Sequence, residues 1–368
     1  MNRIEVLMFG LSSYPGGIEN AIVSVLCHKS FPADEICVTF VTYEDTLAFS
    51  DIIQRKGHRI IRVPHLRKHP CGYVSAIWRL FNAERFDSVY VNMLTAANAA
   101  PVYAAKAFGV KKIFLHAHAS NTVRGFFRRS LHLLNRSLCA KSASVRLACS
   151  AEAGNWLFGN QEFTVIPNAI DCHRFKPSEE NRAIIRRNEG IGSQTLLIGH
   201  VGRFAPEKNH AFMLDILSSL LQNGIDAKMM FVGDGATKED TVMEAQKRGL
   251  IQYVHFMATT SDAEKYYPAF DVFLFPSSFE GFGMAALEAQ SCGVPCVCSD
   301  TVPKTIDVTH TTRFISLSKP KEYWAKSVSE IRSLSREEMY RAVFDSAYNI
   351  EKQIPKFVNL LKGADRQQ

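Results

Sequence analysis

Residues 271–290, DVFLFPSSFEGFGMAALEAQ, contain the structural unit that recurs along the whole chain. The apolar run at 272–276 is typical of a buried strand, a loop with two glycines follows, and a helix is predicted to begin near Gly283. In both directions from this stretch, short apolar runs alternate with segments of helical periodicity. Such alternation predicts parallel sheets of the doubly wound α/β type.

The alternation restarts once, so the chain is predicted to form two Rossmann-like domains that face each other across a cleft. Predicted strands of the first half are IEVLMF, ICVTFV, HRIIRV, DSVYVN, KIFLHAH, VRLACS and FTVIPN, and those of the second half are LLIGHV, KMMFVG, YVHF, DVFLFP and VPCVCS. The proline-flanked stretch PNAIDCHRFKP at 167–177 marks the boundary. We therefore expect domains at 1–170 and 171–349. A last helix is expected over roughly 335–360, and the chain's end, about 350–368, is expected to pack back on the first domain.

Composition is that of a globular protein that folds without disulfides. The 368 residues are 46% hydrophobic and 21% charged, and the nine cysteines are scattered. They are expected to be reduced thiols, as in a cytoplasmic protein. No segment approaches the roughly 20 apolar residues of a membrane span, and the amino terminus lacks the pattern of a cleavable signal.

Positive charge is concentrated in the first half. Residues 1–170 hold 19 Lys and Arg against 11 Asp and Glu, whereas residues 171–368 hold 24 against 25. No acidic residue occurs between Asp87 and Glu152. This asymmetry indicates an anionic partner, either a membrane surface, a phosphorylated lipid or a nucleic acid. A solvated basic face without a partner is the alternative.

The first glycine-bearing loop, at 10–19, follows a predicted strand and opens a helix. It has neither the GxGxxG dinucleotide fingerprint nor a Walker-type lysine, so NAD and P-loop chemistry are both disfavoured. Gly16 and Gly17 still allow a ligand to approach the backbone at a helix start. A plain turn is the alternative.

Two loops of the second half are suited to a diphosphate. Arg203 and Lys208 flank a proline turn at a helix start and can converge on one anion. Glu280 lies just before the helix that begins near Gly283, and Glu288 lies inside it. The helix-start amides favour phosphate, and the carboxylates can hold ribose and sugar hydroxyls. The alternative is a helix with two solvated glutamates.

The sequence shows no metal site. His116 and His118 end a predicted strand on the same face, but further ligands at suitable spacing are missing. No DxD motif occurs. Cys292, Cys296 and Cys298 are expected to be buried strand thiols.

Taken together, these residues resemble family 4 retaining glycosyltransferases of the GT-B fold, and among them the bacterial capsule and exopolysaccharide enzymes. The resemblance covers most of the chain and rests on motifs in the expected order: Gly16-Gly17, the strand-end histidine, Ile166 to Asp171, Gly202-Arg203 with Lys208, Gly233-Asp-Gly235, and Glu280 with Glu288. Ala169 stands where the family often has glycine.

The resemblance implies roles for these positions. Arg203 and Lys208 would neutralise the diphosphate of a nucleotide-sugar, and Glu288 would hold its ribose hydroxyls. Glu280, with the amides of Gly281, Phe282 and Gly283, would hold the donor sugar and its phosphate. His118 matches the family's histidine better than His116, and Gly16 and Gly17 would lie near the phosphates. The implied catalytic residues are His118, Glu280, Arg203 and Lys208.

The expected reaction is metal-independent, retaining transfer of a hexose-type sugar without a cofactor. The donor is expected to be a UDP-sugar, and the acceptor a saccharide or a polyprenyl-diphosphate-linked saccharide, in surface polysaccharide synthesis. A basic amphipathic helix with Arg124, Phe126, Phe127, Arg128, Arg129 and the leucines 131, 133 and 134 is expected to lie on an anionic membrane, as in a cytoplasmic peripheral protein. A core helix with basic outer residues is the alternative.

Two other functions stay open. A nucleotide-sugar 2-epimerase can share the fold, but its acid and base carboxylates cannot be placed here. A nucleic-acid-binding protein could use the basic half, but zinc-finger spacing and RNP-like aromatic motifs are missing. Nucleic acid is therefore not expected as a partner.

Overall fold

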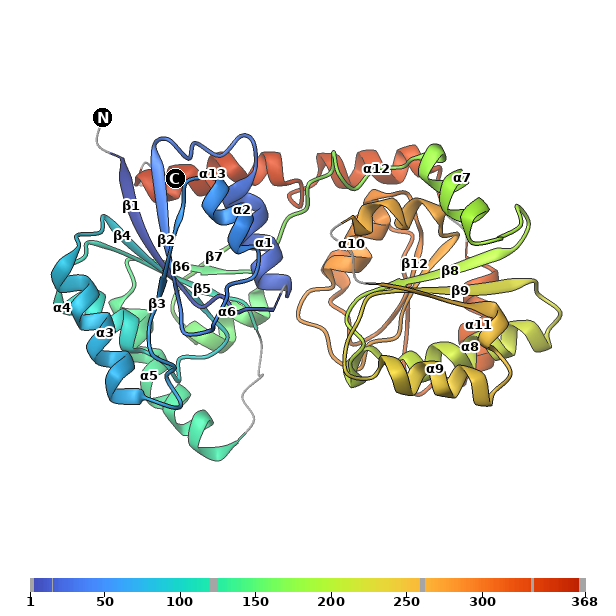
Figure 1. The fold of residues 1–368 in the computed structure, drawn as a ribbon, viewed down its shortest axis with the longest axis horizontal. Helices are drawn as coiled ribbons and strands as arrows, with labels where there is room; N and C mark the ends of the chain where they lie inside the picture. Colours follow the sequence, from blue (N-terminus) through green and yellow to red (C-terminus); the bar gives the residue numbers. More distant parts are fainter. Residues whose placement is uncertain (1–2, 15, 120–124, 259–261, 332–333, 364–368) are drawn as a thin grey trace. The chain divides into compact units, whose positions relative to one another are not determined.

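The computed structural model describes residues 3–14, 16–119, 125–258, 262–331 and 334–363. Contacts between residues divide the chain into two compact units. The first comprises Met1–Ala169 with Ile350–Gln368, and the second comprises Ile170–Asn349. Each unit is an α/β layer structure around its own parallel sheet (Figure 1).

The first unit contains a seven-stranded sheet in the order β3-β2-β1-β4-β5-β6-β7, in which all strands are parallel. The strands are β1 Ile4–Phe9, β2 Ile36–Thr42, β3 Arg59–Arg62, β4 Ser88–Met93, β5 Lys112–Ala117, β6 Val145–Ala148 and β7 Thr164–Val165. One face packs on α3 Pro70–Ala83, α4 Ala100–Ala107, α5 Phe126–Ser142 and α6 Ala151–Phe158. The other packs on α1 Gly17–Cys27, α2 Ser50–Arg55 and α13 Ile350–Lys362.

The second unit contains a six-stranded parallel sheet in the order β10-β9-β8-β11-β12-β13. The strands are β8 Leu196–Val201, β9 Ala227–Val232, β10 Val254–Met257, β11 Val272–Phe275, β12 Cys296–Ser299 and β13 Arg313–Ile315. One face packs on α8 His210–Gln222, α9 Lys238–Lys247 and α11 Lys321–Ser329. The other packs on α7 Glu179–Asn188, α10 Met284–Ser291 and α12 Arg336–Asp345.

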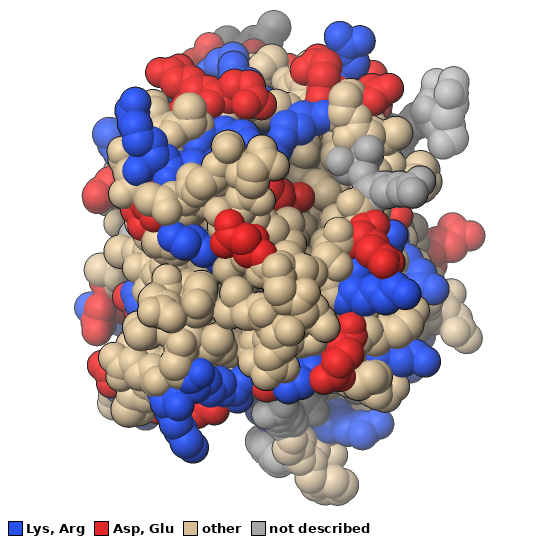
Figure 2. Space-filling view, turned by 90° about the vertical axis from the view of Figure 1, so that its right-hand side faces the viewer, with Lys and Arg blue, Asp and Glu red and all other residues tan. Residues whose placement is uncertain are grey.

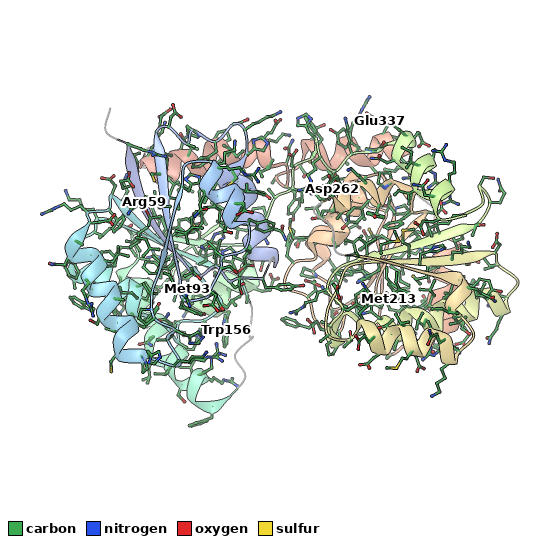
Figure 3. The ribbon with its side chains drawn as sticks, viewed as in Figure 1. Arg59, Met93, Trp156, Met213, Asp262 and Glu337 are labelled. Atoms are coloured by element: carbon green, nitrogen blue, oxygen red, sulfur yellow. The ribbon has the colours of Figure 1, made fainter. Side chains whose placement is uncertain are left out.

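Apolar runs explain the sheets. Every residue of β2, β4, β11 and β12 is buried, as expected for parallel strands covered on both faces. Met93 ends β4 in the first unit, and Met213 on α8 is fully buried in the second (Figure 3). Cys292, Cys296 and Cys298 are free and fully buried.

The prediction of one helix over 335–360 is wrong. Two helices, α12 and α13, lie there, and residues 346–349 separate them. Ser346 ends α12 in an extended conformation, and the Asn349 side chain donates a hydrogen bond to the Phe344 carbonyl at 2.9 Å. α12 belongs to the second unit. α13 belongs to the first, where Phe357 contacts Tyr90 with ring centroids 5.5 Å apart.

Candidate functional site

The second sheet changes winding direction between β8 and β11. Strands β9 and β10 continue to one side of β8, and β12 and β13 continue to the other side of β11. Ligands of open α/β sheets bind beyond the carboxyl ends of the strands at such a switch point. The loop after β8 carries Arg203 and Lys208, and the loop after β11 carries Glu280. The topology therefore brings together two loops that lie far apart in the sequence.

An ion pair joins these two loops. Lys208 Nζ donates to Glu280 Oε2 at 2.5 Å, and both side chains are mostly buried. The ammonium also lies 4.8 Å from the centre of the Phe275 ring. The Ser278 amide donates to the Glu207 carbonyl at 2.8 Å, so the backbones are tied together as well. The ion pair thus fixes the position of the Lys208 ammonium in a place where little water surrounds it.

Arg203 lies on the same loop and is more exposed than Lys208. Its guanidinium donates to Glu207 Oε1 at 2.7 Å, and 48% of its side chain is accessible to solvent. The Glu207 carboxylate thus helps to hold the arginine in place, while about half of the side chain stays accessible to solvent. Such a guanidinium can form charge-assisted hydrogen bonds to a phosphate.

The backbone of the loop after β9 packs against the backbone of the loop that carries Arg203. A Cβ at Gly233 would lie 2.0 Å from the Gly202 carbonyl oxygen, and one at Gly235 would lie 2.3 Å from that of Phe204. Both glycines also have φ near +150°, which L side chains rarely adopt. The motif 233–235 therefore needs glycine at both ends so that the two backbones can touch.

Two buried histidines pack beneath the same loop. His200 Nδ1 donates to the Leu274 carbonyl at 3.0 Å, which links β8 to β11. His210 begins α8 and stacks on Phe204, with ring centroids 4.2 Å apart. Burial lowers the pKa of His210 to about 4 and that of His200 well below its usual value. Both are therefore neutral near pH 7 and stiffen the loop rather than add charge to it.

The start of α10 is built as expected from the sequence. The helix begins at Met284, and Gly283 is its N-cap with φ +99°. Phe282 is buried against Tyr348, and the space a Cβ of Gly281 would take is open. The free amides at this helix start can bind a phosphate oxygen.

Glu288 lies on the second turn of α10, in surroundings that change the pKa of its carboxyl group. Tyr267, which is fully buried, donates its hydroxyl to Glu288 Oε2 at 2.6 Å. Burial raises the pKa of Glu288 to about 7, although the Tyr267 hydrogen bond and the charge of Arg174 both lower it. The carboxyl group thus titrates near neutrality, which is unusual for a glutamate and typical of functional sites.

The first sheet has its own switch point, between β1 and β4. The loop after β1 leads to Gly16, which is the N-cap of α1, and to Gly17, its first residue. Glu19 holds this loop, because its Oε1 accepts hydrogen bonds from the amide and the hydroxyl of Ser12, both at 2.8 Å. Among the described residues, no atom lies within 4 Å of a Cβ placed on Gly17, so there is open space beside this residue at the helix start.

His118 follows β5 and is oriented by Asn92 of β4. His118 Nε2 and Asn92 Oδ1 are 2.8 Å apart, and Asn92 Nδ2 donates to the Phe9 carbonyl at 3.0 Å. The amide oxygen accepts, so Nε2 carries the proton and Nδ1 presents a lone pair. Nδ1 has no hydrogen-bond partner among the described residues. Burial and the adjacent His116 ring hold the pKa of His118 well below its usual value, so the imidazole is neutral.

The expected residues thus form two groups, one in each unit. Arg203, Lys208, Glu280, Glu288 and the glycines around Phe282 gather at the β8/β11 switch point, whereas Gly16, Gly17 and His118 lie at strand ends of the first sheet. Asn92, Tyr267 and Glu207 were missed. Asn92 leaves a signal in the sequence, since it is a polar residue in a buried apolar run. Tyr267 leaves none, because it lies in a short 3-10 helix, Tyr267–Ala269, that no periodic pattern marks.

No three His, Cys, Asp or Glu side chains within the described ranges lie close enough to hold a metal ion. None of the helices in the described part of the chain is long and apolar enough to cross a membrane.

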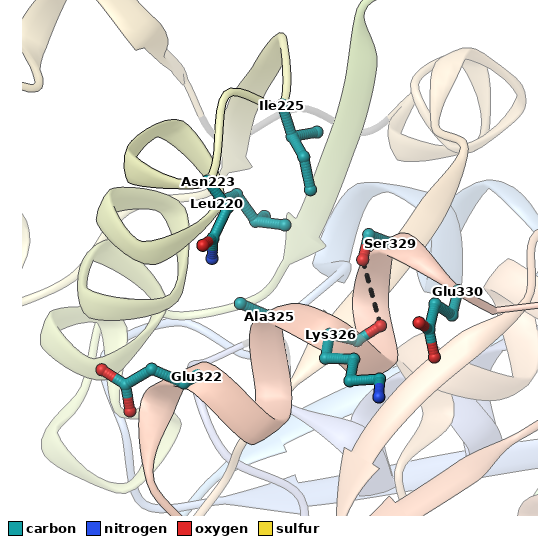
Figure 4. Close-up of a pocket in the computed structure, with 8 residues that line it drawn as sticks. All are labelled: Leu220, Asn223, Ile225, Glu322, Ala325, Lys326, Ser329 and Glu330. Atoms are coloured by element: carbon teal, nitrogen blue, oxygen red, sulfur yellow. Dashed lines mark hydrogen bonds between the residues drawn. The ribbon is translucent and has the colours of Figure 1, made fainter.

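The second unit also has a hollow that lies away from these loops. It lies between the end of α8 and α11, where Leu220, Ile225 and Glu330 are among the residues that line it (Figure 4). This is the end of the sheet at which β9 begins, opposite to the carboxyl ends of the strands. It is therefore separate from the gathered loops.

Two doubly wound α/β units, each built on its own parallel sheet, are the architecture of GT-B glycosyltransferases. Two family profiles match the chain in succession: Glycosyltransferase Family 4 at residues 15–174, and Glycosyl transferases group 1 at residues 181–348. The chain belongs to glycosyltransferase family 4.

Curated relatives agree with this assignment. A putative glycosyltransferase EpsF from Bacillus subtilis is 29% identical over 333 residues, which are 87% of this chain and 86% of that protein. An Escherichia coli enzyme named UDP-Gal:alpha-D-GlcNAc-diphosphoundecaprenol alpha-1,3-galactosyltransferase is 26% identical over 246 residues, 61% of this chain and 60% of that enzyme.

Solved structures share the fold. Anabaena Alr3699/HepE in complex with UDP and glucose superimposes with a TM-score of 0.77 at 17% identity, covering 98% of this chain and 100% of that one. A glycosyltransferase from Rickettsia africae has a TM-score of 0.80 at 16% identity, with complete coverage of both chains.

Proposed function

We propose that this protein transfers a hexose-type sugar from a UDP-sugar to a lipid-linked saccharide, with retention of anomeric configuration, in surface polysaccharide synthesis. The observation that carries the proposal is the paired loops at the β8/β11 switch point, where Lys208 contacts Glu280 at 2.5 Å. The UDP in the Anabaena structure and the diphosphoundecaprenol-linked acceptor in the name of the E. coli relative support the choice of substrates.

In the proposed reaction, the diphosphate is a leaving group that gains negative charge as the sugar–phosphate bond breaks. Arg203, Lys208 and the amides at the start of α10 would stabilise that charge, a type of stabilisation that is the largest single contribution in many enzymes. No metal or other cofactor is assigned a role. The positive charge that develops on the sugar is compatible with front-face attack, in which a phosphate oxygen takes the acceptor's proton.

The remaining residues would hold the donor. Ionised Glu288 would accept hydrogen bonds from the ribose hydroxyls, and Glu280 would accept them from the sugar. His118 Nδ1, which is buried and has no partner among the described residues, would accept one from a sugar hydroxyl once the donor binds, and the helix start at Gly17 would lie near the phosphates. We place the protein at the cytoplasmic face of the membrane, where a polyprenyl-linked acceptor is accessible.

Product analysis tests this proposal. The chain is incubated with UDP-glucose, UDP-galactose or UDP-N-acetylglucosamine and with short polyprenyl-diphosphate-linked sugars, and the product is examined by NMR. One donor is expected to give a lengthened glycolipid with an α-linkage from an α-linked donor. A β-linked product would contradict retention, and epimerised donor formed without acceptor would contradict transfer.

Tyr267→Phe is expected to shift the pH dependence of UDP binding. Glu288 must be ionised to accept hydrogen bonds from two hydroxyls, so affinity should rise as the pH increases through about 7, the pKa of Glu288. The Tyr267 hydrogen bond lowers this pKa. Its loss should move the rise in affinity to higher pH, as measured by calorimetric titration at several pH values.

The matched control for Tyr267 is Tyr73→Phe. Tyr73 is also buried, and its hydroxyl accepts one hydrogen bond, from Asn98 at 2.9 Å in the first unit. This variant should keep the wild-type pH profile. A Tyr267→Phe profile that coincides with wild type would show that the hydroxyl does not position the Glu288 carboxylate.

Asn92→Ala is expected to lower kcat while leaving UDP affinity unchanged. Without the Asn92 oxygen, His118 is free to protonate Nδ1 instead, and the lone pair offered to the sugar is lost. Losing a partner that fixes a histidine tautomer costs roughly tenfold or more in activity. The measurement is UDP release with saturating donor, and Asn98→Ala, five residues after β4 ends at Met93, is the control. Unchanged kcat in a folded Asn92→Ala protein would contradict the role of His118.

A further inference from the structure

Three adjacent helices of the first unit expose large apolar side chains. α3, α4 and α5 cover one face of the first sheet and pack side by side (Figure 1). On α5, Leu134 is 70% exposed and Leu138, one turn later, is 56% exposed. Exposed apolar residues on or directly after these helices are Val74, Trp78, Tyr103, Phe108, Phe126, Leu133, Leu134 and Leu138. Exposed apolar residues gathered on adjacent helices are typical of a binding surface.

Among the described residues of the first unit, the apolar outer face of α5 has no packing partner. His132, Cys139 and Ala140 are fully buried, and His132 stacks on Trp156 of α6 with ring centroids 4.2 Å apart. Leu134 and Leu138 lie on the opposite side of the helix. They therefore add nothing to the packing of this unit and remain exposed in it.

Charge on the same helices has one sign. The sequences of α3, α4 and α5 contain no Asp or Glu, and their exposed surface carries Arg79, Lys106, Arg128, Arg129 and Lys141. The face of the second unit that Figure 2 shows carries mixed charges, since red and blue patches adjoin there. Lys and Arg combined with exposed Leu, Trp and Phe are typical of helices that lie in the headgroup region of a bilayer.

We infer that the outer surface of α3, α4 and α5 docks onto an anionic phospholipid bilayer. Its leucines and aromatic residues would enter the boundary between headgroups and acyl chains, while its lysines and arginines would contact lipid phosphates. A protein partner with an ordinary mixed surface would leave these cations without counter-charges. The inference deepens the proposed function, since it supplies the route to a lipid-linked acceptor.

Arg124 and residues 120–123 lie outside the described residues, and the side chain of Phe127 is likewise not described.

Vesicle flotation of the full chain, without donor or acceptor, tests the inference. Wild type is expected to float with vesicles of phosphatidylcholine and phosphatidylglycerol but not with phosphatidylcholine alone, and high salt should release it. Leu134→Glu with Leu138→Glu should reduce the bound fraction by about tenfold or more, because two apolar contacts are replaced by like charges on an anionic surface. Arg129→Glu with Lys141→Glu should reduce it at least about tenfold.

Matched variants of the second unit test whether vesicle binding depends on the α3–α5 surface or only on the net charge of the protein. Met243→Glu with Ile251→Glu replaces two exposed apolar residues, and Arg187→Glu with Lys247→Glu reverses two exposed cations. Both should bind vesicles like wild type. Thermal melting and UDP titration confirm that each variant is folded.

Three outcomes would overturn the inference: no flotation of wild type with anionic vesicles, equal flotation with neutral ones, or equal losses in the second-unit variants. A wild-type dimer in solution that Leu134→Glu with Leu138→Glu dissociates, without vesicle binding, would assign the surface to a second copy instead. None of these results bears on UDP binding, so failure of this inference is distinguishable from failure of the proposed function.

Discussion

Lys208→Ala is expected to reduce kcat for sugar transfer by roughly 10²–10³-fold, the usual effect of removing one preorganised donor to a developing negative charge. The structure gives a second reason for a large effect. Without Lys208, the mostly buried Glu280 carboxylate loses its ion-pair partner, and the two strand-end loops lose their side-chain link. UDP release in the presence of acceptor measures the effect, and a thermal melt shows whether the second unit stays folded.

Lys228→Ala is the control for this lysine. Lys228 lies on β9 near the opposite end of the same sheet, and its ammonium donates to the Gly190 carbonyl at 3.0 Å. Its loss should leave kcat within about twofold of wild type, since surface substitutions away from a site change free energies by roughly 0.5 kcal/mol or less. A folded Lys208→Ala enzyme with near-normal kcat would show that the leaving diphosphate is stabilised elsewhere.

Glu288→Ala is expected to weaken UDP binding by roughly 10–10²-fold, because hydrogen bonds to a charged group are worth about 1.5–3 kcal/mol. Glu280→Ala, in contrast, is expected chiefly to lower turnover, since Glu280 would contact the sugar rather than the nucleoside. Calorimetric titration with UDP and turnover at saturating donor separate the two effects. Equal effects of both substitutions on both quantities would contradict this division of roles.

A ligand without ribose hydroxyls makes the test of Glu288 specific. Wild type should bind UDP more tightly than 2′,3′-dideoxy-UDP, and Glu288→Ala should bind the two nearly alike, because the carboxylate that distinguishes them is gone. A double-mutant cycle between protein and ligand isolates this contact from general damage to the site. Undiminished discrimination in Glu288→Ala would place the ribose elsewhere.

The strands could be predicted because parallel strands covered on both faces are continuous apolar runs. β13 was not predicted, since its three residues, Arg313–Ile315, are mostly half-buried and begin with an arginine. The prediction of a single terminal helix was wrong because the local sequence pattern does not show where the helix breaks. Residues 336–362 have helical propensity almost throughout, and the break at 346–349 depends on the hydrogen bonds of Ser346 and Asn349 with the preceding turn.

For the site, position after a strand was enough to select Arg203, Lys208 and Glu280, because topology alone brings such loops together. Their mutual arrangement could not be predicted. That Lys208 pairs with Glu280, and that Tyr267 donates to Glu288, depends on side-chain packing between segments separated by 72 and 21 residues. The raised pKa of Glu288 follows from that packing and has no counterpart in the local sequence.

Nucleotide binding tests the central claim, that the loops at the β8/β11 switch point hold a nucleoside diphosphate. UDP, GDP, ADP and their common sugar conjugates are compared by thermal shift, with EDTA present throughout. A ligand that binds only the folded state raises its stability as the ligand concentration exceeds Kd. Selective stabilisation by UDP and UDP-sugars, lost in Glu288→Ala, is the predicted result. No stabilisation by any nucleotide, or a response only to oligonucleotides, would contradict the account.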